Sequence, residues 1–199
     1  MDHIHKVVYI NLAKRQDRKD EIEVELAKAS LDAERFEAIP RKPGIVGCGL
    51  SHLAVLKQAK DNNYPNVLIF EDDFQFIVEP EVFHDTVETF FSTIKEWDVL
   101  MFSYSLEKSQ PYNKTFGKVV AATTASAYLV HQRFYDTLIR TLETALPLLE
   151  STGQHWHYAN DQCWKSLQPQ AQWFYTLQRI GIQRGSYSDN SYEYMDRGV

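Results

Sequence analysis

Short apolar runs and longer stretches with helical spacing follow one another along the whole chain. The runs KVVYINL (6–12), NVLIF (66–70) and WDVLMFSY (97–104) are too short for helices between turn signals, and they predict buried strands. Apolar residues that recur every three or four positions predict amphipathic helices in five other segments. The predicted helices cover residues 14–30, 50–60, 81–96, 131–150 and 157–168.

The segments between these elements complete the predicted layout. We expect a weak strand at 35–39, a strand or strand pair at 119–130, and terminal strands at 173–177 and 179–183. Loops are expected at 40–49 and at 105–118, and a polar tail at 186–199. Pro147 should kink or end the helix that contains it. Strands that alternate with helices predict one α/β domain over residues 1–199, with a mostly parallel sheet that binds ligands beyond the carboxyl ends of its strands.

Composition narrows the class of protein further. The 199 residues are 44% hydrophobic and 24% charged, as in an ordinary globular domain. The net charge of −6, without blocks of Lys or Arg, argues against a nucleic-acid partner. No apolar window approaches the roughly 18 residues of a membrane span, and no signal-peptide pattern is present, so we expect an intracellular, cytoplasmic protein. Cys48 and Cys163 lack CxxC spacing and indicate neither a disulfide framework nor a zinc site.

The most informative feature is the acidic triplet Glu71-Asp72-Asp73, which directly follows the apolar run 66–70. Adjacent carboxylates repel one another unless a cation lies between them, and Mn²⁺ or Mg²⁺ prefers oxygen ligands of this kind. If the strand continues through the triplet, Glu71 and Asp73 share one face and Asp72 points to the other. A solvated turn is an equally good explanation of the triplet taken alone.

Two further groups of residues are weaker signals. Asn11 and the charged residues 14–18 follow the first strand, where basic side chains can bind phosphates, although a charged helix start explains them as well. Gly47-Cys48-Gly49-Leu50-Ser51-His52 places glycines before a predicted helix, where the backbone can approach an anion. This segment lacks the lysine and the spacing of a P-loop.

Taken in order, these blocks resemble a known family. YINLAKRQDR (9–18), RFEAI (35–39), GCGLSHLAV (47–55) and VLIFEDDF (67–74) are similar to the signature blocks of glycosyltransferase family 25. That family contains lipooligosaccharide β-galactosyltransferases and collagen hydroxylysine galactosyltransferases. Looser matches follow at 97–105, 125–130, 160–168 and 180–190, and Pro40-Arg41 stands where the family usually has aspartate-glycine.

The resemblance implies a GT-A-type fold, with a donor-binding half at about 1–105 and an acceptor-side half at about 106–199. It implies a UDP-sugar donor, commonly UDP-galactose or UDP-glucose, and Mn²⁺ (or Mg²⁺) bound by the acidic triplet. The implied metal ligands are Glu71 and Asp73, with Asp189 as a late metal or diphosphate contact. The implied donor-binding residues are Asn11, Arg15, Asp17, Ser51, His52 and Asp72.

Members that make β-linkages from α-linked donors invert the anomeric carbon, which requires a general base for the acceptor hydroxyl. Asp161 is the candidate, since it follows the aromatic segment His155–Tyr158, although it also suits a helix N-cap. Gln183 and Ser188 are weaker candidates from a late matched block. The acceptor is expected to be a glycan or a protein hydroxyl such as hydroxylysine. A nucleotidyltransferase, a metal-dependent phosphohydrolase and a non-catalytic glycan-binding module remain alternatives.

Overall fold

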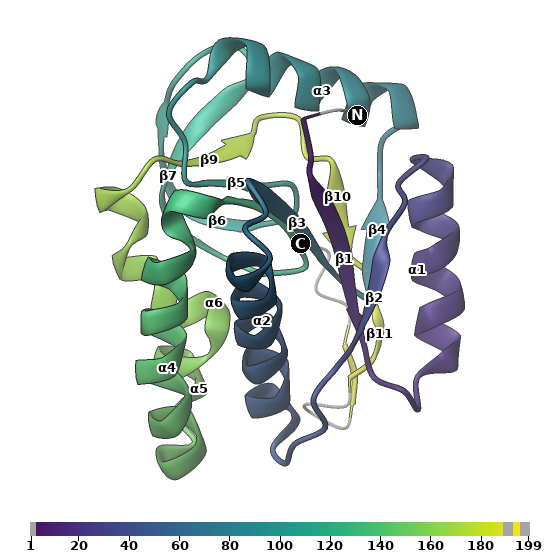
Figure 1. Cartoon of the computed structure of the whole chain (residues 1–199), viewed down its shortest axis with the longest axis vertical. Coiled ribbons are helices and arrows are strands. Elements are labelled where there is room, and N and C mark those ends of the chain that lie inside the picture. The colour runs from purple at the N-terminus through teal and green to yellow at the C-terminus, as the bar shows by residue number, and fades with distance from the viewer. Residues whose placement is uncertain (1–2, 189–192, 196–199) are drawn as a thin grey trace.

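A computed structural model describes residues 3–188 and 193–195 of the chain. Its centre is an eight-stranded sheet in the order β2-β1-β3-β8-β5-β9-β7-β6 (Figure 1). The strands of this sheet are β1 (Lys6–Asn11), β2 (Glu34–Glu37), β3 (Asn66–Glu71), β5 (Val99–Met101), β6 (Ser105–Pro111), β7 (Phe116–Thr123), β8 (Ala127–His131) and β9 (Trp173–Thr176).

Most strands of this sheet run in one direction. β1 pairs in parallel with β2 and β3, and β5 pairs in parallel with β9. β8 runs antiparallel between β3 and β5, and β7 runs antiparallel between β9 and β6. Only β8 and β7 of the eight strands therefore oppose the others, and the predicted α/β domain with a mostly parallel sheet is confirmed.

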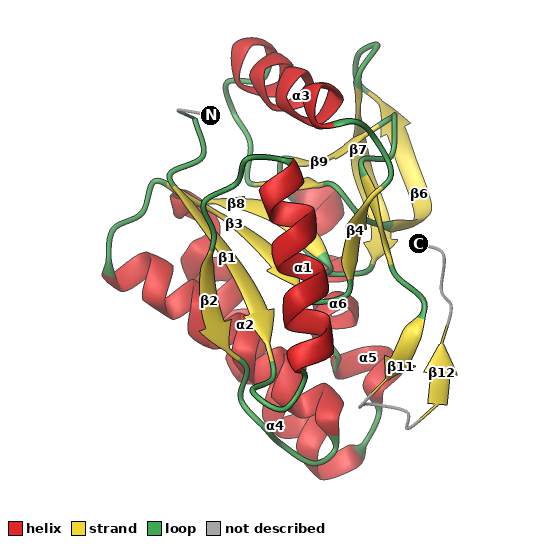
Figure 2. Ribbon diagram, turned by 90° about the vertical axis from the view of Figure 1, so that its right-hand side faces the viewer, coloured by secondary structure: helices red, strands yellow, loops and turns green. Residues whose placement is uncertain are grey.

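Helices cover both faces of the sheet. Helices α1 (Gln16–Lys28) and α3 (Pro80–Thr93) lie on one face, and α2 (Gly44–Asp61) and α4 (Tyr135–Thr152) lie on the other (Figures 1 and 2). Because side chains alternate along a strand, β3 sends Val67 and Ile69 to the α2–α4 side and Leu68 and Phe70 to the α1–α3 side. This explains why residues 67–70 are all apolar.

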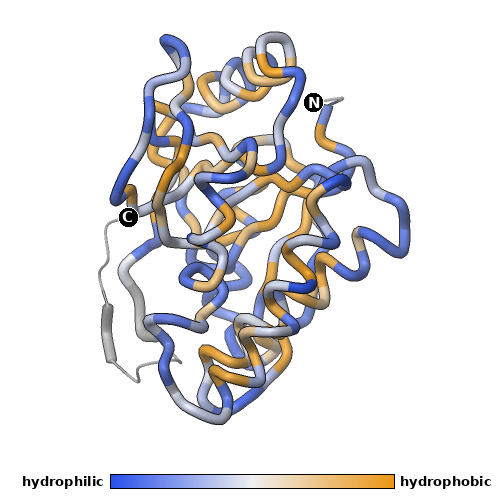
Figure 3. Tube along the Cα trace, turned by 90° about the vertical axis from the view of Figure 1, so that its left-hand side faces the viewer, coloured by the Kyte–Doolittle hydropathy of each residue, from blue (hydrophilic) through white to orange (hydrophobic). Residues whose placement is uncertain are grey.

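The two resulting cores occupy the middle of the molecule. Figure 3 shows the hydrophobic stretches of the trace concentrated in the central strands, with hydrophilic stretches toward the outside. The α1–α3 core is dominated by aromatic rings: Phe83 of α3 makes edge contacts with Phe76 and Phe102. Phe90 makes similar contacts with Trp97. These rings fix α3 across one end of the sheet, away from the carboxyl ends of β1 and β3 (Figure 1).

Helix α2 begins earlier than the glycine pattern indicated. The expected loop at 40–49 ends instead at Pro43, and the helix runs from Gly44 through the glycines. A Cβ at Gly47 would lie 2.5 Å from the Ile39 carbonyl oxygen, and one at Gly49 would lie 2.4 Å from Leu146. These glycines therefore allow the helix to pack closely against Ile39 and Leu146. The prediction of a loop over these positions is wrong.

The prediction of a loop at 105–118 is also wrong. β6 and β7 form an antiparallel hairpin there, joined around residues 112–115. β6 lies at the edge of the sheet with mostly exposed side chains, so it lacks the apolar alternation that identifies a strand. Pro147 does not end α4, which continues to Thr152 with Leu149 buried on its inner side.

Smaller elements complete the chain. β4 (Phe74–Phe76) pairs with β10 (Gly181–Gln183), and β11 (Ser186–Ser188) pairs with β12 (Glu193–Met195). The predicted helix at 157–168 is divided into α5 (His155–Tyr158), α6 (Asn160–Cys163) and the 3₁₀ turns Trp164–Ser166 and Gln168–Gln170, and a further 3₁₀ turn at Gln132–Phe134 precedes α4. Within the described ranges, none of the helices has the length and apolar character needed to cross a bilayer.

Candidate functional site

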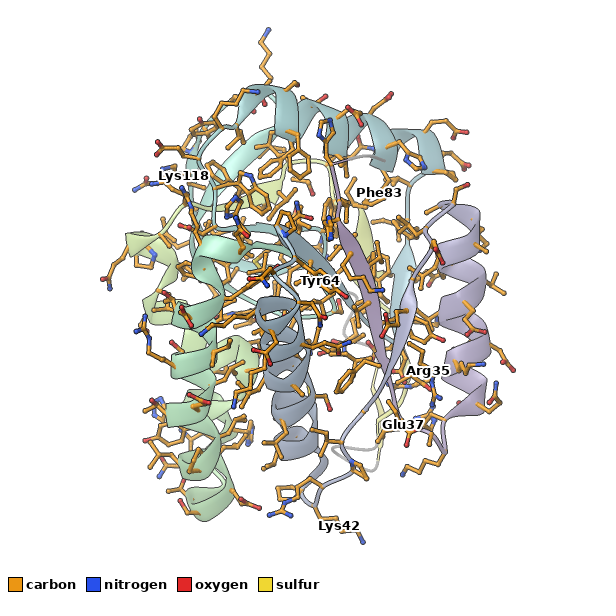
Figure 4. The ribbon with its side chains drawn as sticks, viewed as in Figure 1. Arg35, Glu37, Lys42, Tyr64, Phe83 and Lys118 are labelled. Atoms are coloured by element: carbon orange, nitrogen blue, oxygen red, sulfur yellow. The ribbon has the colours of Figure 1, made fainter. Side chains whose placement is uncertain are left out.

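A cavity of about 580 Å³ opens at the carboxyl ends of β1 and β3. Its walls come from the start of α2, the segment after β2, the loop between β7 and β8, the start of α6, and residues 183–184. Figure 4 shows Lys42, which lines the cavity, at the same end of the molecule as Arg35 and Glu37 of β2. This position beyond parallel strand ends is the one predicted from the strand-helix alternation.

All three residues of the acidic triplet line this cavity. The prediction that Asp72 faces away from Glu71 and Asp73 is wrong, because β3 ends at Glu71 and the chain turns at Asp72 and Asp73 before β4 begins. Strand alternation therefore stops at the first acid. Arg18 of α1 binds the other two: its Nη1 donates to Asp72 Oδ1 at 2.9 Å and to Asp73 Oδ2 at 3.1 Å.

The environment of Asp73 disfavours the charged form of its carboxyl group. Burial first, and then the negative charges of Glu71 and Asp72, raise the pKa of Asp73 to about 7 against the opposing effect of Arg18. Its Oδ2 accepts from Gln183 Nε2 at 3.1 Å, whereas Oδ1 is buried without a hydrogen-bond partner among the described residues. A buried, unpaired carboxylate oxygen is costly, so this atom is suited to a cation.

Glu71 contacts a different set of groups. Its Oε1 lies 2.9 Å from His52 Nε2 and accepts a hydrogen bond from the Cys48 thiol at 3.5 Å. Burial favours a higher pKa for Glu71, but His52 and Cys48 outweigh it and hold the pKa below its ordinary value. His52 is almost fully buried, and its Nδ1 lies 2.8 Å from the Tyr128 hydroxyl.

Asn11 connects the first strand to the triplet. Its Nδ2 donates to Asp72 Oδ2 at 2.8 Å and to the Arg15 carbonyl at 3.0 Å, while its Oδ1 accepts from Arg35 at 3.1 Å. Asn11 is only 1% exposed and is therefore held by this network. The network joins the carboxyl ends of β1 and β3 to Arg35 of β2.

Two other predicted donor-binding residues, Asp17 and Ser51, are not among the residues that line the cavity. Asp17 is exposed and accepts from Arg15, whose Nη2 lies 2.7 Å away, and this bond lowers the pKa of Asp17 to about 2. Asp17 therefore orients Arg15, which itself lines the cavity. Ser51 is fully buried: its hydroxyl donates to the Gly47 carbonyl and accepts from the Ile39 N–H, and so connects α2 to the segment after β2.

Asp161 reaches the cavity from α6 on the wall formed with the β7–β8 loop. Its Oδ2 accepts from the backbone N–H of Thr124 at 3.0 Å. Thr124 has a φ of +77°, a left-handed conformation that is strained for a β-branched residue, and such strain concentrates at functional sites. Beside it, Asn160 also lines the cavity, and its Nδ2 is buried without a hydrogen-bond partner among the described residues.

The late candidates are only partly described. Gln183 lines the cavity next to Asp73, and the backbone N–H of Arg184 donates to the Asp73 carbonyl at 2.7 Å. β10 therefore brings a segment 110 positions away to the acidic triplet. Asp189 lies outside the described residues, and the structure describes no side chain for Ser188.

Both acidic and basic side chains line the cavity. Among the described residues, four acids line it (Glu71, Asp72, Asp73 and Asp161) together with six bases (Lys14, Arg15, Arg18, Arg41, Lys42 and Arg184). Arg18, Cys48, Asn160 and Arg184 are lining residues that the predicted site set omitted. Arg18 was within the charged segment 14–18, but no sequence pattern indicated that its guanidinium lies between Asp72 and Asp73.

Comparison with known proteins tests the resemblance. Residues 42–148, more than half of the chain, match the sequence profile of glycosyltransferase family 25, described as LPS biosynthesis protein. The chain belongs to glycosyltransferase family 25. The matched part of this family 25 transferase contains the acidic triplet and His52, whereas Asn11 and Asp161 lie outside it. A search of curated protein sequences found no significant match.

Solved structures share the fold of this family 25 chain at low sequence identity. A glycosyltransferase involved in the glycosylation of the major capsid of PBCV-1 is 11% identical, with a TM-score of 0.56 over 94% of this chain and 95% of that chain. A197 from STIV is 13% identical, with a TM-score of 0.53 over 98% and 97% of the two chains. At these identities the likeness establishes the fold, and the expected GT-A-type domain is confirmed.

Proposed function

We propose that this family 25 chain is a metal-dependent, inverting glycosyltransferase that uses a UDP-sugar. It moves a hexose, galactose or glucose, to a hydroxyl of a glycan or of a hydroxylysine-type acceptor. The observation that carries the proposal is the charge pattern of the cavity, in which buried carboxylates lie at the strand ends and basic side chains surround them. A metal diphosphate has the complementary pattern, with a cation held between anionic groups.

The donor set fits a hard divalent cation. Asp73 Oδ1 is buried and unpartnered among the described residues, and the raised pKa of Asp73, caused first by burial, marks a carboxylate that needs positive charge nearby. Glu71 and Asp73 are the proposed ligands of Mn²⁺ or Mg²⁺, and Asp189 stays a candidate. The bound ion supplies Lewis-acid stabilisation of the negative charge on the diphosphate leaving group.

The remaining lining residues suit the rest of the donor. Arg15, Lys42 and Arg184 offer positive charge to the phosphates, and α2 directs its N-terminus at the cavity without a side-chain cap. Asp72, fixed by Asn11 and Arg18, is the proposed contact for ribose or sugar hydroxyls. The cavity volume lies within the range of about 300–1,000 Å³ that is typical of small-ligand sites.

Asp161 is the proposed general base. Its carboxylate lies on the cavity wall formed by α6 and the β7–β8 loop, and the hydrogen bond from Thr124 orients it within the cavity. It would take the proton of the acceptor hydroxyl as that oxygen attacks the anomeric carbon and the bond to the diphosphate breaks. The exposed Trp156 of α5, five positions earlier, provides an aromatic face on which an acceptor sugar can stack.

A UDP-release assay tests the proposal. The full chain is incubated with Mn²⁺ and either UDP-galactose or UDP-glucose, and free UDP is measured with and without candidate glycan acceptors. We expect release with one donor, and a loss of more than about a hundredfold in Asp73→Asn, because metal stabilisation of the leaving group is worth several kcal/mol. Asp85→Asn, an exposed aspartate on α3, is the matched control and should retain the rate.

The products separate the alternatives. UMP or pyrophosphate in place of UDP would indicate a nucleotidyltransferase or phosphohydrolase on the same fold and would overturn the proposal. The absence of any UDP binding at millimolar concentration with Mn²⁺, measured by calorimetry, would indicate a glycan-binding module without a donor site.

A further inference from the structure

One group of side chains in the cavity has a different chemistry from the oxygen-rich triplet. Cys48, His52 and Glu71 each point a potential metal-binding atom toward the same place, and these atoms all lie within 4.8 Å of one another. We call this group the thiol–imidazole–carboxylate cluster. All three of its residues line the cavity.

The fold holds the three residues in this arrangement. Cys48 and His52 are four positions apart in α2, so they lie on the same face of the helix, one turn apart. Glu71 is the last residue of β3, and it reaches both of them across the junction between helix and strand. The spacing of the cysteines could not reveal the cluster, because its third member comes from another element.

The imidazole is positioned by a partner outside the cluster. Tyr128 of β8 holds His52 Nδ1 at 2.8 Å, which leaves Nε2 directed at Glu71. A metal-binding histidine is normally held through its other ring nitrogen in this way, and the contact fixes the ring orientation. Tyr128 is 1% exposed, so its hydroxyl is itself fixed by packing.

Two of the three distances between these atoms are close to those of a tetrahedral zinc site. Zn–S bonds of about 2.3 Å and Zn–N or Zn–O bonds of about 2.0–2.1 Å place neighbouring ligand atoms roughly 3.3–3.6 Å apart. In the protein, Cys48 Sγ lies 3.5 Å from Glu71 Oε1, and His52 Nε2 lies 2.9 Å from the same oxygen. A movement of about half an ångström would bring the imidazole and carboxylate atoms to the zinc spacing. The third pair, Cys48 Sγ and His52 Nε2, lies within 4.8 Å.

We propose that Cys48, His52 and Glu71 form a binding site for Zn²⁺ or a similar borderline-soft divalent metal. The mixed sulfur, nitrogen and oxygen donors select such an ion over Mn²⁺ or Mg²⁺, which prefer oxygen. Three protein ligands leave the fourth tetrahedral position open toward the cavity, as in zinc sites that bind an exogenous molecule.

This site shares Glu71 with the proposed Mn²⁺ site. Zn²⁺ bound to the cluster takes that carboxylate from the donor-binding centre, so it should inhibit transfer. This consequence rests on the proposed function, whereas metal binding by the cluster does not.

Cobalt spectroscopy tests the binding directly. Metal-free full chain, kept reduced with a phosphine, is titrated with Co²⁺, which occupies zinc sites and gives a thiolate-to-cobalt charge-transfer band in the near ultraviolet. We expect a band that saturates at one equivalent and disappears when Zn²⁺ is added. No band, or a band that persists in Cys48→Ser, would overturn the proposal.

The second cysteine provides the matched control. The sequence contains two cysteines, so Cys163→Ser leaves Cys48 as the remaining thiol and should keep the full band. Loss of the band in folded Cys163→Ser would assign it to Cys163 and contradict the proposal. This variant decides the assignment even if Cys48→Ser fails to fold, which circular dichroism would show.

An activity arm separates this proposal from the proposed function. Where UDP release is observed with Mn²⁺, the Zn²⁺ concentration that halves it should be at least tenfold higher in Cys48→Ser than in the unmodified chain. An unchanged value would overturn inhibition through the cluster. If no UDP is released at all, the proposed function fails, and the cobalt titration still decides whether the cluster binds metal.

Discussion

Replacing Asp73 with asparagine should stabilise the metal-free protein, although it removes a residue of the proposed active site. Burial raises the pKa of the Asp73 carboxyl from 3.8 to about 7, with Glu71 and Asp72 as further causes. The folded protein therefore holds the proton more tightly than the unfolded chain. Between these two pKa values the unfolded chain ionises first, so stability falls as the pH rises and levels off above about pH 7.

The magnitude follows from the two acid constants. They differ by roughly a thousandfold, and each factor of ten corresponds to about 1.4 kcal/mol, so ionised Asp73 costs the fold about 4 kcal/mol above pH 8. At pH 5 the cost is only about 2 kcal/mol, because Asp73 is still protonated in the folded protein. The asparagine variant has no such titration. Its stability relative to the unmodified chain should rise by about 2–3 kcal/mol from pH 5 to pH 8.

Urea unfolding in the presence of a chelator measures this change. Comparing the two pH values cancels any pH-independent effect of the amide on packing, and Asp85→Asn on the surface of α3 is the matched control, expected to shift by less than about 0.5 kcal/mol. A difference between Asp73→Asn and the unmodified chain that is the same at pH 5 and pH 8 would refute the electrostatic reasoning.

Three further substitutions test how the fold supports the site, each by urea unfolding at neutral pH. Asn11→Ala should cost about 1–3 kcal/mol, because Asp72 loses a buried hydrogen bond. A loss below about 0.5 kcal/mol, which is typical of a surface substitution, would contradict the network. Phe83→Ala should cost about 3–5 kcal/mol, since the ring is fully buried among aromatic neighbours, and a cost near that of an exposed residue would disprove the packing of α3. Gly181→Ala should cost about 1–3 kcal/mol, because a Cβ there would lie 2.2 Å from the Phe74 ring; a neutral result would show that β10 and β4 pack differently.

Local patterns were sufficient to predict the elements that lead to the site. The runs 6–12 and 66–70 became β1 and β3, because burial on both faces leaves a continuous apolar signal. The acidic triplet could be located at the end of β3 for the same reason. The start of α2 was missed, because Gly47 and Gly49 are required by tight contacts with Ile39 and Leu146 that no local pattern contains.

The hydrogen bonds and ion pairs of the site join residues that are distant in sequence. Arg18 meets Asp72 across 54 positions, and Gln183 meets Asp73 across 110. Neither distance leaves a spacing that can be recognised in one sequence. Predicting that Asp72 faced away failed for a related reason, since the chain turns directly after Glu71 into β4, which pairs with the distant strand β10.

The central claim is that a divalent metal held by Glu71 and Asp73 of the acidic triplet binds the diphosphate of a UDP-sugar. Calorimetric titration of UDP into the full chain, with Mn²⁺ and again with a chelator, tests it most directly. We predict that Mn²⁺ tightens UDP binding at least tenfold, about 1.4 kcal/mol, and that Asp73→Asn removes this difference. Equal UDP affinity with and without Mn²⁺, or a metal effect that survives Asp73→Asn, would contradict the account.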